Sequence, residues 1–210
     1  GTSGAELWVS DGTAAGTVLL KDINPGSNQS SPIGLTLLGD KLLFNAYDPV
    51  NGYELWVTDG TTAGTTLLKD IYAGALSSSP FAFTVLGDKL LFSADDGVNG
   101  LELWSTDGTT SGTTLLKDLS PGLGSSDPWG FTLYDGRLLF EASDELNSRE
   151  LWVTDGTAAG TVLLKDINQQ QVGSEPLGFV TVVIPNSAPT DIAMTGGNVA
   201  ENSANGAAVA

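Results

Sequence analysis

Apolar and polar residues follow one another in short blocks along the chain, and the same blocks return at a fixed interval. The segment ELWVTDGTTAGTTLLKDI spans residues 54–71, and nearly the same eighteen letters return at residues 150–167. Glu-Leu-Trp begins at residues 6, 54, 102 and 150, Asp-Gly-Thr at 11, 59, 107 and 155, and Lys-Asp at 21, 69, 117 and 165, always 48 residues apart. Repetition of this fidelity indicates a repeat architecture before it indicates a catalytic centre.

Each 48-residue repeat contains two predicted β-hairpins. In the first hairpin, ELWVTDG and TTLLKDI are rich in apolar and β-branched residues, and residues 60–64 supply the turn between them. In the second hairpin, the Gly87-Asp88 turn joins a strand at residues 83–86 to a strand at residues 89–94. The pattern therefore predicts four short strands per repeat and gives no signal for a helix.

Near-continuous apolar runs such as LLF and LW are typical of a small sheet that is covered on both faces. A four-stranded sheet packed between copies of itself is a β-propeller blade. We expect an all-β fold with β-propeller-type repeats, comprising three full blades plus partial ones over residues 1–184. A β-solenoid uses shorter repeats, and an immunoglobulin-like array repeats at about 100 residues, so both are disfavoured.

The two ends of the repeat region predict how a ring of blades closes. Residues 178–184 align with the first strand of a repeat, whereas the chain before Glu6 enters a repeat after its second strand. We expect residues 179–184 to form the innermost strand of a closing blade whose outer strands come from an upstream segment. That segment is residues 6–23 in a four-bladed ring. In a larger ring, which we favour, further repeats precede residue 1.

The recurring ELWVSDGT, ELWVTDGT and ELWSTDGT resemble the ELWxxDGT repeat family, found in long secreted or surface proteins of bacteria. The resemblance covers about residues 4–184 and implies an extracellular or cell-surface location, with no established enzymatic activity. The composition then changes, and residues 185–210 resemble a linker and the start of a cadherin-like repeat, a β-sandwich module. In that family the glutamate of VAEN is a calcium ligand, so the resemblance implies this role for Glu201.

Charge and composition narrow the range of partners. The 210-residue chain carries 25 acidic and 8 basic residues, a formal net charge of −17 that repels nucleic acid and anionic membranes. It has no stretch of about 18 apolar residues, so insertion into a membrane is not expected. Cysteine and histidine are absent, which excludes disulfides, thiolate zinc sites and histidine-based proton transfer.

Two sets of repeated residues receive structural interpretations. The tryptophans of the ELW motif either pack between blades, which we favour, or line a sugar-binding surface. The aspartates that precede Gly-Thr are predicted to accept backbone N–H bonds across a turn. These two sets are Trp8, Trp56, Trp104 and Trp152, and Asp11, Asp59, Asp107 and Asp155. Trp129 occurs once, in the place of Ile33 and Phe81, and is interpreted as an apolar plug between blades or as part of a unique site.

The acidic loops DPVNG, DGVNG and DELNS are the candidate metal sites. Each places a side-chain oxygen at its first and fourth positions, and calcium takes six to eight oxygen ligands. The same residues form Asx turns without a metal, which is the interpretation we favour. Calcium is the only cofactor candidate, and its predicted ligands here are Asp48, Asn51, Asp96, Asn99, Asp144 and Asn147.

The acidic residues recur with the blades and leave no singular catalytic constellation, so we expect the chain not to be an enzyme. The predicted function is a non-catalytic structural or adhesive module of a long extracellular bacterial repeat protein, stabilised by calcium if the loops bind it. Its partners are then neighbouring domains or copies of the same parent chain. The alternative is a carbohydrate-binding propeller that binds surface glycans at several loops and gains avidity by multivalency.

Overall fold

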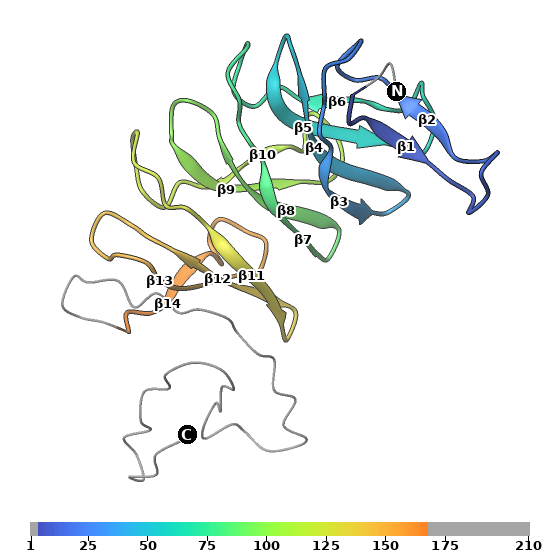
Figure 1. Ribbon diagram of the computed structural model, residues 1–210. Helices are drawn as coiled ribbons and strands as arrows, with labels where there is room; N and C mark the ends of the chain where they lie inside the picture. Colours follow the sequence, from blue (N-terminus) through green and yellow to red (C-terminus); the bar gives the residue numbers. More distant parts are fainter. Residues whose placement is uncertain (1–3, 168–210) are drawn as a thin grey trace, which may run out of the picture.

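The computed structural model of the protein describes residues 4–167 (Figure 1). These residues form fourteen β-strands in four antiparallel sheets, and within this range there is no helix of any kind. Accordingly, no helix among the described residues is long and apolar enough to cross a membrane. The prediction of an all-β, antiparallel fold is confirmed for these residues.

The sheets follow the order of the chain. The first sheet contains β1 (Leu7–Val9) and β2 (Val18–Lys21). The second contains β3 (Ile33–Leu38), β4 (Lys41–Asp48), β5 (Gly52–Thr58) and β6 (Thr66–Lys69). The third contains β7 (Phe81–Leu86), β8 (Lys89–Asp95), β9 (Leu101–Thr106) and β10 (Thr114–Lys117). The fourth contains β11 (Trp129–Tyr134), β12 (Arg137–Ala142), β13 (Glu150–Thr154) and β14 (Val162–Lys165).

The predicted hairpins are present, with strand bounds that differ from the predicted ones for identifiable reasons. The strand predicted at residues 83–86 begins at Phe81, and a register shift interrupts its pairing with β8 between Phe81 and Thr84. The strand predicted over TTLLKDI ends at Lys69. It ends there because the next apolar residue, Ile71, donates its backbone N–H to the carboxylate of Glu54 instead of to the neighbouring strand.

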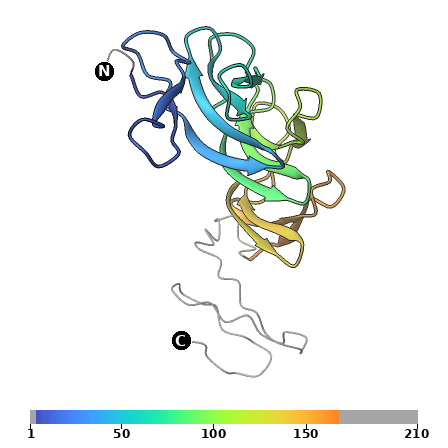
Figure 2. The same ribbon diagram turned by 90° about the vertical axis from the view of Figure 1, so that its right-hand side faces the viewer.

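The sheets are stacked along an arc, with β3, β7 and β11 side by side along one edge (Figure 1, Figure 2). The first and fourth sheets lie at opposite ends of this arc, so the described residues form an open series of sheets and no closed ring. The closing strand predicted at residues 179–184, the module predicted at residues 185–210 and Glu201 lie outside the described residues. The closed propeller therefore stays a prediction.

The hydrophobic core lies between successive sheets. In the first junction, Leu7, Leu20 and Ile23 of the first sheet pack against Phe44, Ala46 and Trp56 of the second. The next two junctions repeat this arrangement 48 and 96 residues further on, around Trp104 and around Trp152. Because aromatic side chains bury some 150 to 250 Å² each, these tryptophans are a large part of every junction.

The first sheet departs from this pattern at Trp8. Its counterparts Trp56, Trp104 and Trp152 are buried, whereas Trp8 is 54% exposed. Two contacts are missing in the first sheet. The strand that places Phe44 opposite Trp56 has no counterpart beside β1, and no described sheet precedes it. The prediction that every ELW tryptophan is buried is wrong at this position.

Candidate functional site

The four aspartates of the Asp-Gly-Thr motif cap the outer turn of each sheet. In the second sheet, Asp59 Oδ1 accepts hydrogen bonds from the Thr61 backbone N–H at 2.8 Å and from the Thr61 hydroxyl at 2.6 Å. These hydrogen bonds lower the pKa of the exposed Asp59 carboxyl. A Cβ atom at Gly64 would lie 2.0 Å from Asp59 Oδ1, so the turn also requires glycine there. The same contacts recur at Asp11, Asp107 and Asp155.

A second repeated polar feature is the buried glutamate of the ELW motif, which sequence reasoning missed. Glu54 is fully buried and accepts the backbone N–H of Ile71 and of Ser78 at 2.8 Å, together with the Ser78 hydroxyl at 2.6 Å. This arrangement connects the third strand of one sheet to the loop that leads to the next sheet. We call it the Glu–Ser clasp, and its members are the pairs Glu6–Ser30, Glu54–Ser78 and Glu102–Ser126.

Burial dominates the electrostatics of the clasp. Desolvation raises the pKa of Glu54 and raises the pKa of Glu102 to about 6, although the hydrogen bonds to both carboxylates act in the opposite direction. Each carboxylate is enclosed by main-chain and serine donors and is closed to a substrate. The sequence contained a signal for this feature, because a serine follows the glutamate by 24 residues in each of the three pairs.

The acidic loops are Asx turns. Asp96 Oδ1 accepts the backbone N–H of Val98 at 2.9 Å and of Asn99 at 2.8 Å, and Asp96 Oδ2 accepts the Asn99 side-chain amide at 2.7 Å. Burial acts to raise the pKa of Asp96, but these hydrogen bonds outweigh it and lower the pKa. The Asp48 and Asp144 loops make the same contacts, with Asn51 and Asn147 as the amide donors.

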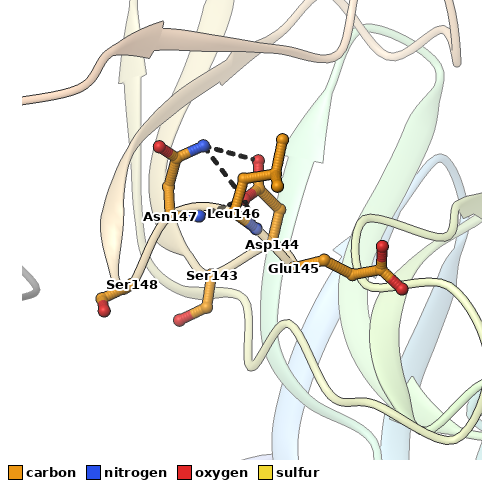
Figure 3. Close-up of a pocket in the computed structure, with 6 residues that line it drawn as sticks. All are labelled: Ser143, Asp144, Glu145, Leu146, Asn147 and Ser148. Carbon is orange, nitrogen blue, oxygen red and sulfur yellow. Dashed lines mark hydrogen bonds between the residues drawn. The ribbon is translucent and has the colours of Figure 1, made fainter. Parts of the chain in front are cut away.

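This arrangement bears on the predicted calcium sites. In each loop the asparagine presents its N–H₂ group, not its oxygen, to the aspartate (Figure 3). Glu145, the additional carboxylate of the last loop, points away from Asp144 (Figure 3). Among residues 4–167, no three acidic, histidine or cysteine side chains gather as a metal site would require. The loops in this conformation do not fit a calcium ion, and calcium binding stays a prediction.

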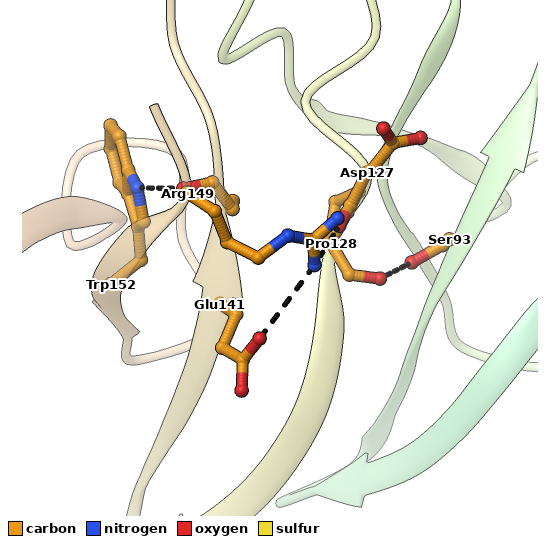
Figure 4. A network of polar contacts seen from close by, with 7 residues as sticks. Ser93, Asp127, Pro128, Glu141, Arg149 and Trp152 are labelled. Carbon is orange, nitrogen blue, oxygen red and sulfur yellow. Dashed lines mark hydrogen bonds and ion pairs between the residues drawn. The ribbon is translucent and has the colours of Figure 1, made fainter. Parts of the chain in front are cut away.

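One cluster in the fourth sheet breaks the repeat. Trp129, at the start of β11, is 54% exposed, and its ring lies 5.5 Å from that of Phe81. Trp129 is therefore not a buried plug between sheets. It pairs across the strands with Glu141, whose buried carboxylate lies 3.7 Å from the Arg149 guanidinium (Figure 4). We call Phe81, Trp129, Glu141 and Arg149 the aromatic–ionic patch.

The polar half of this patch was also missed by sequence reasoning. The positions equivalent to Glu141 are Asn45 and Ser93, whose side chains donate to the carbonyl oxygens of Pro80 and Pro128. In the fourth sheet, Arg149 instead reaches the preceding loop and donates to the Asp127 carbonyl oxygen at 3.4 Å (Figure 4). The available signal was the departure from the repeat itself, because Arg149 replaces Tyr53 and Leu101.

Comparisons with known proteins give little further guidance. No protein-family model matches the chain, and no curated protein matches it. One similar solved structure is that of a puromycin-hydrolyzing peptidase from Mycobacterium tuberculosis, with 19% sequence identity and a TM-score of 0.44. The match covers 72% of this chain and 24% of the peptidase chain.

This finding corrects one prediction. The expectation that the chain is not an enzyme is contradicted, because the similar structure comes from a peptidase, and we no longer maintain that expectation. The likeness is too weak to assign a reaction or a catalytic residue to this chain, which spans about a quarter of the peptidase's length.

Proposed function

We propose that the chain is a structural or adhesive module of a longer extracellular protein related to the ELWxxDGT repeat family. The observation that supports this proposal most directly is the repetition of the sheet-to-sheet junctions. The tryptophan, the buried glutamate and the capping aspartate recur 48 residues apart, and from the second sheet onwards each performs the same contact. The repeated residues thus hold the stack together, as expected of a structural module.

The junctions favour a stack that resists extension. Each junction combines a buried apolar cluster with a Glu–Ser clasp between the last hairpin of one sheet and the loop before the next. A buried hydrogen bond to a charged group contributes about 1.5 to 3 kcal/mol. Because repeat proteins are stabilised by nearest-neighbour contacts, each further sheet adds a similar increment.

Stretching single molecules of the full chain between two handle proteins tests this proposal. We expect discrete force peaks, with extensions that are multiples of about 160 to 170 Å, the contour length of one 48-residue repeat. Ser126→Ala should lower the force of one peak by weakening one clasp, whereas Glu145→Ala, an exposed change, should alter none. Extension without any force peak would identify a flexible linker and reject the load-bearing role.

The aromatic–ionic patch supports carbohydrate binding as a second candidate function. An exposed tryptophan beside a second aromatic ring offers a face on which a sugar ring stacks, and the partly exposed Arg149 guanidinium nearby offers a polar partner. Screening the chain on a glycan array, followed by calorimetry with the best ligand, tests this candidate. Trp129→Ala should abolish binding and Trp8→Ala, which removes an equally exposed tryptophan, should retain it. Equal binding by both variants would exclude the patch.

A further inference from the structure

The chain contains two Asp-Pro peptide bonds, Asp48–Pro49 and Asp127–Pro128. Such a bond is unusually labile in acid, because the aspartate carboxyl can attack the carbonyl carbon of its own residue. The proline nitrogen, which belongs to a tertiary amide, is a good leaving group once it is protonated. The attack requires a carboxyl that is free to turn toward the carbonyl carbon, and it is faster when the carbonyl is polarised. The structure provides both at one of the two bonds.

The carboxylate of Asp48 is fixed by its own loop. Asp48 is 6% exposed, and its Oδ1 accepts the backbone N–H of Val50 at 2.8 Å and of Asn51 at 3.0 Å. Its Oδ2 accepts the side-chain amide of Asn51 at 2.9 Å. Both oxygens therefore have partners, and a turn toward the Asp48 carbonyl carbon would break these hydrogen bonds.

The carboxylate of Asp127 is free by comparison. Its side chain is exposed and accepts no hydrogen bond from residues 4–167. It points away from the Arg149 guanidinium and from Glu141, the ion pair beside it (Figure 4). Rotation about χ1 can therefore bring a carboxyl oxygen onto the carbonyl carbon of Asp127 without breaking a contact within the described residues.

The main chain on both sides of this bond is held by the third sheet. The Asp127 N–H donates to the Leu101 carbonyl oxygen at 3.3 Å, and the Ser93 hydroxyl donates to the Pro128 carbonyl oxygen (Figure 4). Asp127 has a positive φ of 47°, whereas residues that precede proline favour an extended backbone. Cleavage would therefore relieve backbone strain.

A cationic donor lies on the carbonyl oxygen of the same bond. Arg149 Nη1 donates to the Asp127 carbonyl oxygen at 3.4 Å, and the guanidinium lies 3.7 Å from the buried carboxylate of Glu141 (Figure 4). A donor at this position stabilises the negative charge that develops on the oxygen when a nucleophile attacks the carbon. Glu141 is then a positioning residue, because it holds the arginine beside the bond.

The other sheets have the same backbone without this chemistry. The residues equivalent to Asp127 are Ser31 and Ser79, which also precede proline and have φ values of 46° and 47°. The residues equivalent to Arg149 are Tyr53 and Leu101. The fourth sheet therefore contains a nucleophile and a carbonyl donor at positions where the repeated fold requires neither.

We propose that Asp127–Pro128 is a self-cleavage site of the folded chain, active in mild acid. The protonated carboxyl of Asp127 attacks the carbonyl carbon of its own residue and forms a cyclic anhydride. The C–N bond breaks, and the proton of the carboxyl passes to the Pro128 nitrogen. One water molecule then opens the anhydride, so the net reaction is hydrolysis to a C-terminal Asp127 and an N-terminal Pro128. Cleavage here does not depend on the structural role proposed above.

The cut would leave the arc assembled. The fourth sheet packs on the third through Phe140 and Trp152, which meet Leu103 and Leu119 in a buried cluster that does not include the cleaved bond. The cut chain should therefore keep the size of the intact chain in gel filtration and give two fragments only after denaturation.

Incubation of the full chain at about pH 4, where aspartate carboxyls are partly protonated, tests the proposal. One sample is folded, as checked by its β-sheet circular dichroism, and the other is in denaturant. In denaturant, both Asp-Pro bonds should be cut at comparable rates, because the Asp48 loop is lost. In the folded chain, mass spectrometry should show Asp127–Pro128 cut at least about 10-fold faster than Asp48–Pro49.

Two results of this experiment would overturn the proposal. The first is equal cleavage of the two bonds in the folded chain. The second is a folded chain that stays intact after residue 127 under conditions that cut the same bond in denaturant.

Three variants separate the nucleophile from the arginine. Asp127→Ser, which restores the residue of the other repeats, should abolish cleavage at this bond. Ser79→Asp places a carboxyl on the same backbone with Leu101 at the position of the arginine, so its new Asp-Pro bond should be cut about 10-fold more slowly than Asp127–Pro128. Glu145→Gln, at an exposed acid of the same sheet, should be cut like wild type.

The variants also give results that would contradict the proposal. Cleavage of Asp127→Ser after residue 127 would identify a contaminating protease instead of self-cleavage. Equal rates at the bond created by Ser79→Asp and at Asp127–Pro128 would remove the role of Arg149.

Discussion

The outer hairpins of the first and fourth sheets share thirteen consecutive residues, 11–23 and 155–167, yet their exposure is reversed. Trp8 is 54% exposed whereas Trp152 is 6% exposed. Leu20 is 8% exposed whereas Leu164 is 50% exposed. The same letters therefore give a buried tryptophan at one end of the arc and a buried leucine at the other.

The difference shows that the adjacent sheet, not the local sequence, determines which face is buried. Among residues 4–167, the first sheet has a neighbouring sheet only on the side of Leu20, and the fourth sheet has one only on the side of Trp152. The stability of such a stack is close to a sum of terms for the units and for their interfaces. Matched substitutions in the two hairpins should therefore have unequal effects.

The largest difference is expected for tryptophan. Trp152→Ala should lower the free energy of unfolding by about 3 to 5 kcal/mol, because it leaves a cavity in the third junction and removes the hydrogen bond from Trp152 Nε1 to the Ala142 carbonyl oxygen. Trp8→Ala should cost about 1 kcal/mol or less. Denaturant titration of both variants measures the difference, and equal losses would show that the two hairpins do not differ as described.

The reverse order is expected for leucine. Leu20→Ala should lower the free energy of unfolding by about 2 to 4 kcal/mol, because Leu20 packs in the first junction. Leu164→Ala should cost about 1 kcal/mol, since half of its side chain is already exposed. Thermal unfolding of the two variants, at the same pH and concentration, gives the comparison. A larger loss for Leu164→Ala would mean that another part of the chain covers Leu164.

Substitutions in the Glu–Ser clasp should cost the same stability at the end of the arc as in its middle. Ser30→Ala and Ser126→Ala each remove a hydroxyl donor from a buried carboxylate, of Glu6 and of Glu102 respectively. Each should cost about 1.5 to 3 kcal/mol, and the two losses should agree closely because both clasps are complete. Ser27→Ala, at an exposed serine, serves as the control. If Ser30→Ala lowers the free energy of unfolding much less than Ser126→Ala does, the clasp of the first sheet is weaker than the clasp of Glu102.

The smallest expected effect is the change in stability with pH that arises from the buried glutamates of the second and third sheets. Burial raises the pKa of Glu102 from 4.5 to about 6 and also raises the pKa of Glu54. Folding therefore binds a proton at Glu102 in the window from about pH 4.5 to about pH 6. Stability should therefore fall as the pH rises through that window, by about 1 kcal/mol. Thermal midpoints across the window test this, and Glu102→Gln should flatten the trend whereas Glu145→Gln should not.

The four capping aspartates give the opposite dependence at lower pH. Hydrogen bonds from the threonine two residues later lower the pKa of each one, so their contribution is present above about pH 3.8 and is lost as the pH falls below it. A stability that keeps rising below pH 3.8 would show that these turns do not depend on the ionised carboxylate.

The sequence was sufficient for the features that depend on local patterns. The two hairpins and the aspartate turns follow from strand and turn propensities, which act over a few residues, and the 48-residue spacing follows from the recurring motifs. The exposure of Trp8 could not be predicted in this way, because its burial depends on residues far away in sequence. The clasp spans 24 residues, beyond the range of a local pattern, and Glu141 and Arg149 come together only when β12 and β13 pair.

The glycine that faces each capping aspartate leaves little room for another residue in the turn. Because these turns are always 48 residues apart, chains of this kind can change in length by whole repeats. Deleting residues 54–101 would join Tyr53 to Glu102, so that the third ELW motif would stand where the second one stands now. Trp104 would then meet Leu7, Leu20 and Ile23, the partners that Trp56 has now. A gene that encodes such repeats can therefore gain or lose a whole repeat while the contacts between successive sheets stay the same.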